Sequence, residues 1–463
     1  MQLLGHVDVK NSQLISGWAF NKESKESIYV DIIVNDVLQA RVAANLPRPD
    51  LARVNVTDGS TLHGFQYNWP WRVRTMPTEQ TEIKVCFANT KKTLPNGLFK
   101  FASLIENYSK QIESEFRDDS FWRPSISIQN RKIHLGGYVL AKDLELKSTD
   151  FVIQGRPFEQ VKFIENEQIQ KQFWFLSSRK ALFQAQTSLI DSDFENKEII
   201  IDWVNKKTNQ PCNLNQRIYI PKEVFNIDKI NLPTQQLAAR VSGPKINMTQ
   251  FVIGGYSTYQ TMLQIINECT EKKLSDFKKV LDWGCGCGRV SRYFLNNPDA
   301  ELELYGTDID SVNIDWCRQN FSTGNFSVAP LYPPLQFEDN QFDLCFGISV
   351  FTHLTEYTQH QWLQEIRRIM KPGGIVFMTY HGEFVFLSSN VSTRIMENTL
   401  DEGFNSEIPD TNLGTKLPDK DYYKATYHST DYVRRVWGNY FDILDIRQAT
   451  NGYYQNIVVM RAI

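Results

Sequence analysis

The sequence predicts a multidomain protein in which two β-sandwich-like domains precede a doubly wound α/β domain. Three observations support this fold class. Short apolar strands separated by turn residues fill most of the first half of the chain, strand and helix patterns alternate in the second half, and a glycine-rich loop follows the first strand of the alternating part. With 463 residues, 41% of them hydrophobic, the chain is long enough for about three domains with filled cores.

Changes in pattern along the chain divide it into five segments. These are a β-sandwich module at 1–95, a helical connector at 96–124, a second β-rich module at 125–222, a bridging segment with a helix at 223–276, and the α/β domain at 277–463. The connector helix is predicted to begin in the apolar run 98–105, and the helix of the bridging segment to cover 258–269.

The two β-rich modules share a local pattern. In the first, glycine and an aromatic residue in the strand 14–20 precede a polar loop and then a strand and turn at 28–36. Residues 133–140 and 150–157 of the second module echo this order. Two interpretations are open: an internal duplication, or two unrelated β modules with similar hairpins.

Composition and charge narrow the range of functions. The formal net charge is −3, without the basic excess that nucleic-acid binders usually show, so no nucleic-acid partner is expected. No run approaches the roughly 18 apolar residues of a membrane span, and no signal peptide is recognisable at the start. Cys285 and Cys287 lack a second ligand pair at zinc spacing, so we expect reduced thiols, no bound metal and a cytoplasmic location.

The first strand of the α/β domain enters a glycine-rich loop with the pattern D-x-G-x-G-x-G, in which Gly284, Gly286 and Gly288 are the glycines. Glycine lets a ligand approach the backbone closely, and the helix that follows adds N–H donors. Asp308 ends the second strand, roughly 20 residues past the loop, where a carboxylate can hold both hydroxyls of a ribose. The pattern therefore predicts a nucleoside-containing cofactor.

Arg289 distinguishes between two kinds of cofactor domain. The dinucleotide fingerprint G-x-G-x-x-G/A requires a small residue at this position, where the helix packs on the strand. Arg289, together with the acidic residue before the loop, Asp282, therefore argues against a nicotinamide dinucleotide enzyme.

The successive motifs of this domain resemble those of class I S-adenosylmethionine-dependent methyltransferases. They read DWGCGCGR at 282–289, GTDID at 306–310, FDL at 342–344 continuing to SVFTHL at 349–354, and MKPGG at 370–374. The resemblance implies S-adenosyl-L-methionine as the cofactor and a Rossmann-like sheet. It also implies a terminal antiparallel hairpin, formed by residues 441–448 and 456–461.

The resemblance further implies which residues bind the cofactor. The implied set is Asp282, Gly284, Gly286, Gly288, Arg289, Asp308, Ile309, Leu331, Ile348 and Ser349. The glycines would line the methionine half of the cofactor, with Asp282 and the pair 348–349 near its amino group. Asp308 would hold the ribose, Ile309 would pack on the adenine, and the backbone near Leu331 would meet the adenine edge. The acidic residue that usually follows the third strand is missing here.

Two histidines are candidate catalytic residues. His381 follows the fifth strand and His353 follows the fourth, and both strand ends open onto the carboxyl edge of the sheet, where ligands bind in such folds. A hydroxyl acceptor must lose its proton, and histidine suits that task. The alternative is that both are ordinary loop histidines. His360 is expected on the surface, and His428 beside a helix cap.

The first module supplies the hint about the acceptor. Its segments GHVD at 5–8, GWA at 17–19, RPDL at 48–51 and HGF at 63–65 resemble a β-sandwich module found beside bacterial glycosyltransferases and other enzymes of surface-polysaccharide biosynthesis. By association, this resemblance implies O-methylation of a sugar hydroxyl in a surface glycan or its precursor. Two alternatives stand: a small-molecule or natural-product O- or N-methyltransferase whose β modules form a homo-oligomer, and a non-catalytic glycan-binding scaffold.

Overall fold

The computed structural model describes most of the chain, in the ranges 2–10, 14–24, 27–53, 61–68, 82–100, 120–141, 145–173, 179–212, 216–297, 301–388, 399, 402–409, 419, 422–448 and 455–463. Contacts divide the chain into two compact units. The first comprises Met1–Glu115 with Val391–Gly403, and the second comprises Phe116–Asn390 with Phe404–Ile463. Across the described residues, no helix combines the length and hydrophobicity of a membrane span.

Two four-stranded sheets make up the described part of the first unit. One has the order β1-β2-β6-β5, from β1 (Leu3–Lys10), β2 (Leu14–Asn21), β6 (Leu62–Asn68) and β5 (Leu46–Pro47). The other has the order β4-β3-β7-β8, from β4 (Val37–Ala43), β3 (Tyr29–Val34), β7 (Glu82–Phe87) and β8 (Thr93–Lys100). Both sheets contribute to one apolar core, to which Phe65 comes from the first sheet and Ile32 from the second.

Two local features explain this arrangement. Asn35 and Asp36 have φ of 48° and 62°, as a two-residue turn between antiparallel strands requires, and they join β3 to β4. Gly17 lies on β2, where an added Cβ would stand 2.9 Å from the ring of Phe65. Glycine at this position therefore lets a large aromatic side chain fill the core.

The predicted connector helix is wrong at both described ends. Leu98–Phe99 lie in strand β8, in which Phe99 is buried in the core of the first unit. Short apolar runs fit a strand as well as a helix, and here alternation with exposed residues decides for the strand. Arg123 and Pro124 lie in strand β9 (Ser120–Gln129), and the middle of the predicted helix lies outside the described residues.

The second unit begins with two more four-stranded sheets. One has the order β13-β14-β10-β9, from β13 (Gln160–Ile164), β14 (Arg179–Ser188), β10 (Lys132–Ala141) and β9. The other has the order β12-β11-β15-β16, from β12 (Arg156–Pro157), β11 (Thr149–Ile153), β15 (Glu198–Asn205) and β16 (Ile218–Pro221). The ring of Phe151 stacks on Phe183 of the opposite sheet, with centroids 4.6 Å apart. The β-rich character predicted for both modules is confirmed.

The two modules have the same topology. In chain order, β1 of the first module corresponds to β9 of the second, β2 to β10, and so on up to β8 and β16. With this correspondence, the two sheets of the first module have the same strand orders as the two sheets of the second. A short helix lies between the fifth and sixth strands of each, α1 (Pro49–Arg53) and α3 (Glu167–Gln172). Positive φ angles at Gln154 and Gly155 make a turn where Asn35 and Asp36 make the equivalent one. This identity of order favours the duplication over two unrelated modules.

A seven-stranded sheet forms the core of the α/β part, in the order β19-β18-β17-β20-β21-β25-β24. Its strands are β17 (Lys279–Trp283), β18 (Glu303–Asp308), β19 (Asn325–Val328), β20 (Phe342–Gly347), β21 (Met370–Tyr380), β24 (Phe441–Arg447) and β25 (Asn456–Ala462). The first five in the order are parallel, and β25 pairs antiparallel with both β21 and β24. This arrangement agrees with the predicted doubly wound sheet and terminal hairpin.

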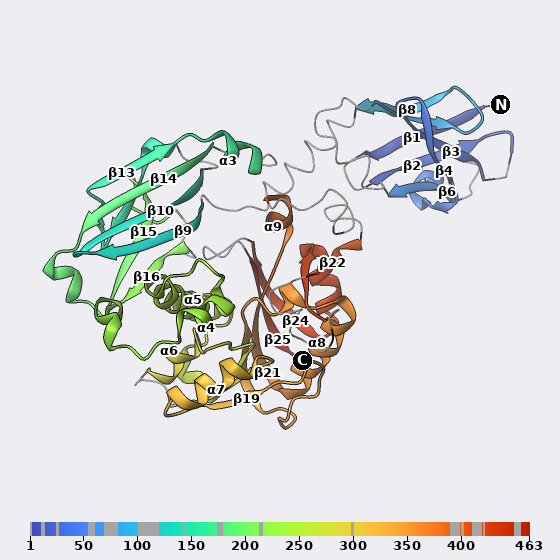
Figure 1. Cartoon of the computed structure of the whole chain (residues 1–463). Coiled ribbons are helices and arrows are strands. Elements are labelled where there is room, and N and C mark those ends of the chain that lie inside the picture. The colour runs from blue at the N-terminus through green and yellow to red at the C-terminus, as the bar shows by residue number, and fades with distance from the viewer. Residues whose placement is uncertain are drawn as a thin grey trace. The chain divides into compact units, whose positions relative to one another are not determined.

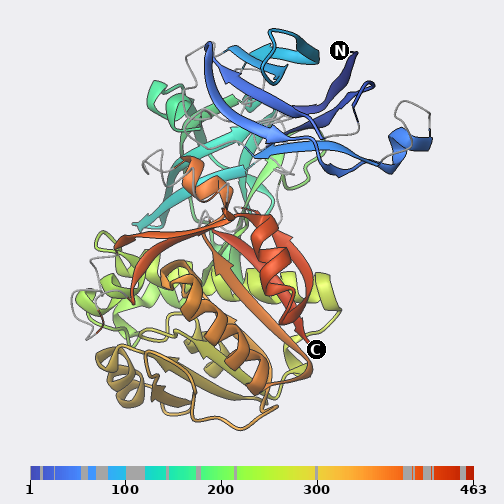
Figure 2. The ribbon, with the colours of Figure 1, turned by 90° about the vertical axis from the view of Figure 1, so that its right-hand side faces the viewer.

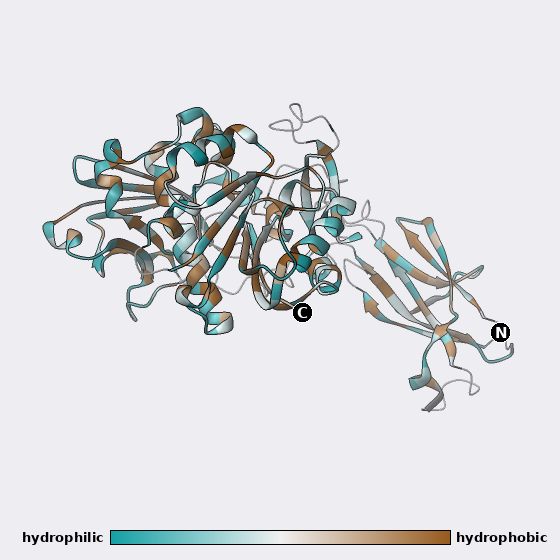
Figure 3. Cartoon of the chain, turned by 90° about the horizontal axis from the view of Figure 1, so that it is seen from below, coloured by the Kyte–Doolittle hydropathy of each residue, from teal (hydrophilic) through white to brown (hydrophobic). Residues whose placement is uncertain are grey.

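Helices cover both faces of this sheet (Figures 1 and 2). On one face, Leu281 and Trp283 of β17 pack with α8 (Glu356–Ile369). On the other, Val280 packs with α5 (Met248–Thr270) and α6 (Ser291–Leu295). Successive strand residues point to opposite faces of a sheet. Figure 3 shows brown, hydrophobic stretches on strands of the chain. The apolar run of β17 is therefore explained by burial on both sides.

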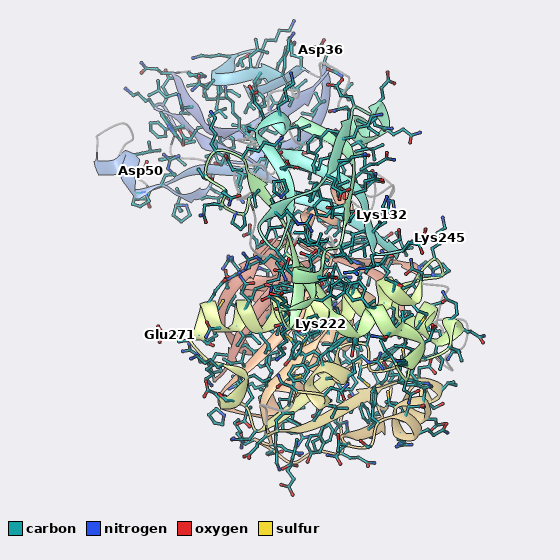
Figure 4. All side chains as sticks on the ribbon, turned by 90° about the vertical axis from the view of Figure 1, so that its left-hand side faces the viewer. Asp36, Asp50, Lys132, Lys222, Lys245 and Glu271 are labelled. Carbon is teal, nitrogen blue, oxygen red and sulfur yellow. The ribbon has the colours of Figure 1, made fainter. Side chains whose placement is uncertain are left out.

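Helix α5 joins the second β module to the α/β sheet. The hydroxyl of its Ser257 accepts from the backbone N–H of Tyr219 in β16 at 3.0 Å and donates to the carbonyl of the same residue at 3.1 Å. Toward the sheet, Tyr259 packs edge-on against Phe294 of α6. Figure 4 labels Lys245, which precedes α5 in the sequence, and Glu271, which follows its last residue. The helix is longer than predicted, because burial on two sides stabilises its first half as well.

Candidate active site

The glycine-rich loop lies between β17 and α6, and each of its glycines is required by the geometry. Gly284, Gly286 and Gly288 have φ of 78°, 53° and 72°, which side chains rarely tolerate. An added Cβ would also collide with Val350 at the first, Val241 at the second and Phe321 at the third. The loop is therefore a tight, close-packed turn, and the close approach of a ligand to its backbone stays a prediction.

Asp308 lies at the end of β18 beside this loop. Its Oδ2 accepts from the backbone N–H of Gly286 at 2.7 Å, and its Oδ1 accepts from that of Asp310 at 2.8 Å. Burial raises the pKa of Asp308 to about 6. Each oxygen of a carboxylate has two lone pairs, so each can accept one more hydrogen bond, as a vicinal diol would supply. The residue fits a ribose.

Asp282 lies beneath the loop. The hydroxyl of Ser291, at the start of α6, donates to its Oδ2 at 2.5 Å. Burial raises the pKa of Asp282 to about 7, and the nearby charge of Asp308 adds to this shift. The carboxyl group therefore ties the end of β17 to the helix that follows, and it titrates near neutral pH.

Arg289 faces helix α5. Its Nη1 lies 3.4 Å from the hydroxyl of Thr258, and the residue is only 7% exposed. An added Cβ on Gly255 of the same helix would collide with the carbonyl of Arg289. The structure thus accounts for Arg289 as a contact between the loop and α5, and its role toward a cofactor stays a prediction.

The expected adenine side is lined by half-buried apolar residues. Ile309 follows Asp308 directly, Leu331 follows β19, and both pack against the core on the α8 face. The backbone N–H of Ala329 donates to the carbonyl of Asp308 at 2.9 Å, which fixes the two strand ends together. Sequence reasoning missed Arg240 of α4 (Gln235–Ser242), which donates to Asp310 at 2.6 Å and brings α4 to this edge.

Ile348 and Ser349 follow β20 at the same edge of the sheet. Ser349 has φ of 65°, and its backbone N–H donates to the hydroxyl of Thr379 at 2.7 Å. Its own hydroxyl accepts from Nε2 of Gln455 at 2.9 Å. The polar groups at the ends of β20 and β21 and before β25 are thus hydrogen-bonded to one another.

His381 joins this group from the end of β21. Its Nδ1 lies 3.2 Å from the carbonyl oxygen of Thr426, and its Nε2 lies 3.4 Å from Nε2 of Gln455. The ring of Tyr427 is tilted against it at 5.6 Å. Thr426 and Tyr427 belong to β23 (Lys424–His428), which pairs with β22 (Phe404–Pro409) in a hairpin between β21 and β24.

His353 ends a short 3-10 helix (Phe351–His353) that follows β20, and it packs beside the same hairpin. Its ring stacks on Tyr423 at 4.2 Å with an interplanar angle of 10°, and Tyr423 pairs with Leu354. His381, by contrast, lies 3.4 Å from Gln455, which donates to the hydroxyl of Ser349. Which of the two histidines acts as a catalytic residue stays a prediction.

The remaining two histidines of this domain are structural. His428 is buried, it donates from Nε2 to Gln359 at 2.9 Å, and burial lowers its pKa to about 3. It precedes Ser429, which caps the short helix α11 (Thr430–Tyr432), as predicted. The prediction that His360 is a surface residue is wrong, because it is partly buried and hydrogen-bonded to Tyr440 at 2.7 Å.

Known proteins match the part of the chain that contains the loop. The family described as a methyltransferase domain matches residues 281–378. Tocopherol O-methyltransferase of Arabidopsis thaliana is 31% identical over 121 residues, which are 25% of this chain and 33% of that protein. Phosphoethanolamine N-methyltransferase of Plasmodium falciparum is 29% identical over 119 residues, 24% of this chain and 44% of that protein. The matches thus span less than half the length of these relatives.

Solved structures also align with part of this chain. Magnesium protoporphyrin IX methyltransferase of Synechocystis, solved with bound S-adenosylhomocysteine, is 16% identical with a TM-score of 0.31, and the alignment covers 47% of this chain and 89% of that one. The family match begins in β17 and ends in β21, so it includes every residue expected to bind the cofactor and stops short of His381. Residues 281–378 are therefore a methyltransferase domain, whose cofactor is S-adenosylmethionine.

Proposed function

We propose that the whole chain is an S-adenosylmethionine-dependent methyltransferase that methylates a hydroxyl group, with His381 as the general base. The observation that carries this proposal is the arrangement of Asp308 and the three left-handed glycines at one sheet edge, inside the matched domain. His381 directly follows β21, which is parallel to β17 and separated from it by β20. The residue therefore lies at the same edge of the sheet as the glycine loop.

The residues present fit the cofactor. Asp308 would accept from the two ribose hydroxyls, and the backbone of the loop of Gly284, Gly286 and Gly288 would lie along the methionine half. Ile309 and the segment near Leu331 would pack on the adenine, while Ile348 and Ser349 would approach the amino group, near Asp282. When bound, S-adenosylmethionine supplies an activated methyl group.

The protein's own contribution is positioning and proton removal. Holding two reactants in line supplies up to about 7–11 kcal/mol of the barrier reduction in such displacements. His381 would accept the proton of the acceptor hydroxyl through a ring nitrogen, a role for which histidine is suited. An amine acceptor that is already neutral would need no such base.

The acceptor we propose is a sugar hydroxyl in a bacterial surface glycan or its precursor. The support is the resemblance of the first module to β-sandwich modules of polysaccharide assembly, together with the paired four-stranded sheets of that module. On this proposal the β modules bind sugar, or join copies of the chain, and the protein acts in the cytoplasm. A small-molecule acceptor is the second candidate, because the two relatives are named for tocopherol and phosphoethanolamine.

Calorimetric titration with S-adenosylhomocysteine tests the cofactor half. We expect binding to the wild type and its loss in Asp308→Ala, whereas Asp315→Ala, an exposed acidic residue of the following helix α7 (Ser311–Asn320), serves as the matched control and binds normally. Absence of binding to the wild type would sink the methyltransferase proposal and leave a glycan-binding scaffold. Transfer of a tritiated methyl group to sugar nucleotides or polysaccharides, against transfer to small aromatic and amine acceptors, separates the two acceptor classes.

A further inference from the structure

We propose that Gln455 is a positioning residue of this site. Its side-chain amide holds the His381 ring with Nε2 as the basic nitrogen and links that nitrogen to Ser349 at the end of β20. The inference rests on the proposed function, because it concerns the base of that reaction. No sequence motif points to Gln455, which lies outside the segment that matches methyltransferase domains.

The contact with Thr426 fixes the position of the proton on His381. A backbone carbonyl can only accept, so Nδ1, 3.2 Å from that oxygen, must carry the hydrogen. In a neutral imidazole the other nitrogen, Nε2, then has the lone pair. Gln455 approaches this lone pair with its NH2 group, at 3.4 Å, so the contact has a donor on one side and an acceptor on the other.

The orientation of the Gln455 amide is itself determined by neighbouring groups. The hydroxyl of Thr379 accepts from the backbone N–H of Ser349 at 2.7 Å and donates to Oε1 of Gln455 at 2.7 Å. With Oε1 engaged in this way, Nε2 of Gln455 faces the hydroxyl of Ser349, at 2.9 Å, and the His381 ring. Serine, threonine, glutamine and histidine thus form a connected set of complementary hydrogen bonds, which the hydroxyl of Ser349 extends to that of Thr352 at 2.9 Å.

Packing keeps Gln455 in register. The next residue, Asn456, is buried and donates to the hydroxyl of Tyr380 at 3.3 Å. An added Cβ on Gly382 would collide with the Asn456 side chain, so the chain on either side of His381 contacts the start of β25 closely. Gln455 is 7% exposed, and a buried amide that lost its partners would be costly.

This arrangement leaves the base ready for an acceptor. The distance from Gln455 to His381 is the longest in the set, at 3.4 Å, and bonds of that length are weak. A hydroxyl of the acceptor can therefore take the place of the amide at Nε2 of His381 while Gln455 stays bonded to Ser349. The acceptor oxygen would then lie between the base and the residue that we expect to contact the cofactor.

The position of the proton can be measured on the full chain without any ligand. In protein with ¹⁵N-labelled histidine, long-range ¹H–¹⁵N correlation spectra separate the two tautomers, and loss of one signal set in His381→Gln assigns the ring. We expect Nδ1–H in the wild type. Gln455→Met keeps the length of the side chain but removes its hydrogen bonds. It should reduce the tautomer ratio by at most about fivefold, because a contact of 3.4 Å contributes less than the average hydrogen bond to which fivefold corresponds.

Two further variants separate orientation from packing. Gln455→Glu can still accept from Thr379 but has no NH2, so Nε2 of His381 should become protonated. Thr379→Val removes the donor that orients Gln455 and should act in the same direction as Gln455→Met, which keeps the test available if the latter folds poorly. Gln364→Met, an exposed glutamine of α8, is the matched control and should change nothing.

The outcomes distinguish this inference from the proposed function. Wild-type tautomer populations in Gln455→Met and in Thr379→Val would overturn it, whatever the cofactor binding. Failure of the wild type to bind S-adenosylhomocysteine would overturn the proposed function alone. Once an acceptor is found, Gln455→Met should lower kcat about tenfold with unchanged S-adenosylhomocysteine affinity. A wild-type kcat in this variant would show that Gln455 only fills space.

Discussion

The ring of Phe173 packs against the ring of Phe384, with centroids 5.5 Å apart. Phe173 ends helix α3 of the second β module, and Phe384 lies in α9 (Glu383–Ser388), which begins two residues after His381. Both side chains are buried, at 1% and 0% exposure. The second β module therefore packs against the segment that follows the proposed base.

Phe173→Ala should reduce both stability and turnover. Truncation of a buried phenylalanine typically costs about 3–5 kcal/mol of unfolding free energy, and here the cavity would open directly beside α9. Urea unfolding and methyl transfer measure the two effects. Phe158→Ala is the matched control, because Phe158 is also buried in the second β module but contacts Phe151. It should lose similar stability and keep the kcat of the wild type; equal loss of kcat in both variants would contradict a specific role of the contact with α9.

Gly286→Ala should weaken cofactor binding through two effects. The residue has φ of 53°, and its added methyl group would collide with Val241 of α4. We expect S-adenosylhomocysteine affinity to fall more than about tenfold, with about 1–3 kcal/mol of strain in the loop. Calorimetry and thermal unfolding report the two.

The control for Gly286 is Gly155→Ala in the second β module. Gly155 has φ of 77° but nothing lies within 4 Å of an added Cβ, so this variant carries the backbone strain without the collision. It should lose only about 1 kcal/mol and bind normally. Normal binding by Gly286→Ala would show that the loop can shift away from α4 and that its tight packing is not needed.

Asp282 should make stability fall as pH rises toward neutral. Its pKa is about 7 in the folded protein against an ordinary value of 3.8, so between these values the folded state holds a proton that the unfolded state has lost. That contribution is complete below the unfolded pKa and disappears as pH rises through about 7. Asp308 acts with the same sign, but only up to its pKa of about 6.

The pH range in which the titration of Asp282, rather than that of Asp308, changes the free energy of unfolding is therefore about pH 6 to pH 8. Urea unfolding across this window should show a decline in the wild type that is much smaller in Asp282→Asn. Asparagine still accepts the hydrogen bond from Ser291, so the fold is retained. An identical slope in the two proteins would mean that another group titrates there.

The local part of the site could be predicted from sequence. Gly284, Gly286, Gly288 and Asp308 follow strands at regular spacing, so a strand–loop–helix pattern is sufficient to place them at one sheet edge. Position alone did not reveal what Arg289 contacts, because its partner Thr258 lies on a helix that precedes the domain.

The long-range part could not be predicted. Gln455 reaches His381 only because β25 pairs antiparallel with β21, and the carbonyl of Thr426 comes from a hairpin inserted after that strand. Any residue type can supply a backbone carbonyl, so the contact of His381 with Thr426 cannot be predicted from the sequence. A single glutamine before a strand belongs to no sequence motif. The error at Leu98–Phe99 has a different cause, since a short apolar run does not distinguish strand from helix.

Arg240→Ala should weaken cofactor binding with little effect on stability. The Arg240 guanidinium donates to Asp310 at 2.6 Å, and Asp310 caps helix α7 directly after the residue pair expected to meet ribose and adenine. A partly exposed ion pair contributes less than about 1 kcal/mol to folding, but this one holds α4 over the cofactor edge. We expect S-adenosylhomocysteine affinity to fall about three- to tenfold, the equivalent of about 1 kcal/mol.

Arg217→Ala, which breaks a similar pair with Asp202 in the second β module, is the matched control and should bind normally. Equal affinity in both variants would show that α4 keeps its place without this ion pair, and that the contact of Val241 with the glycine loop is enough to hold it.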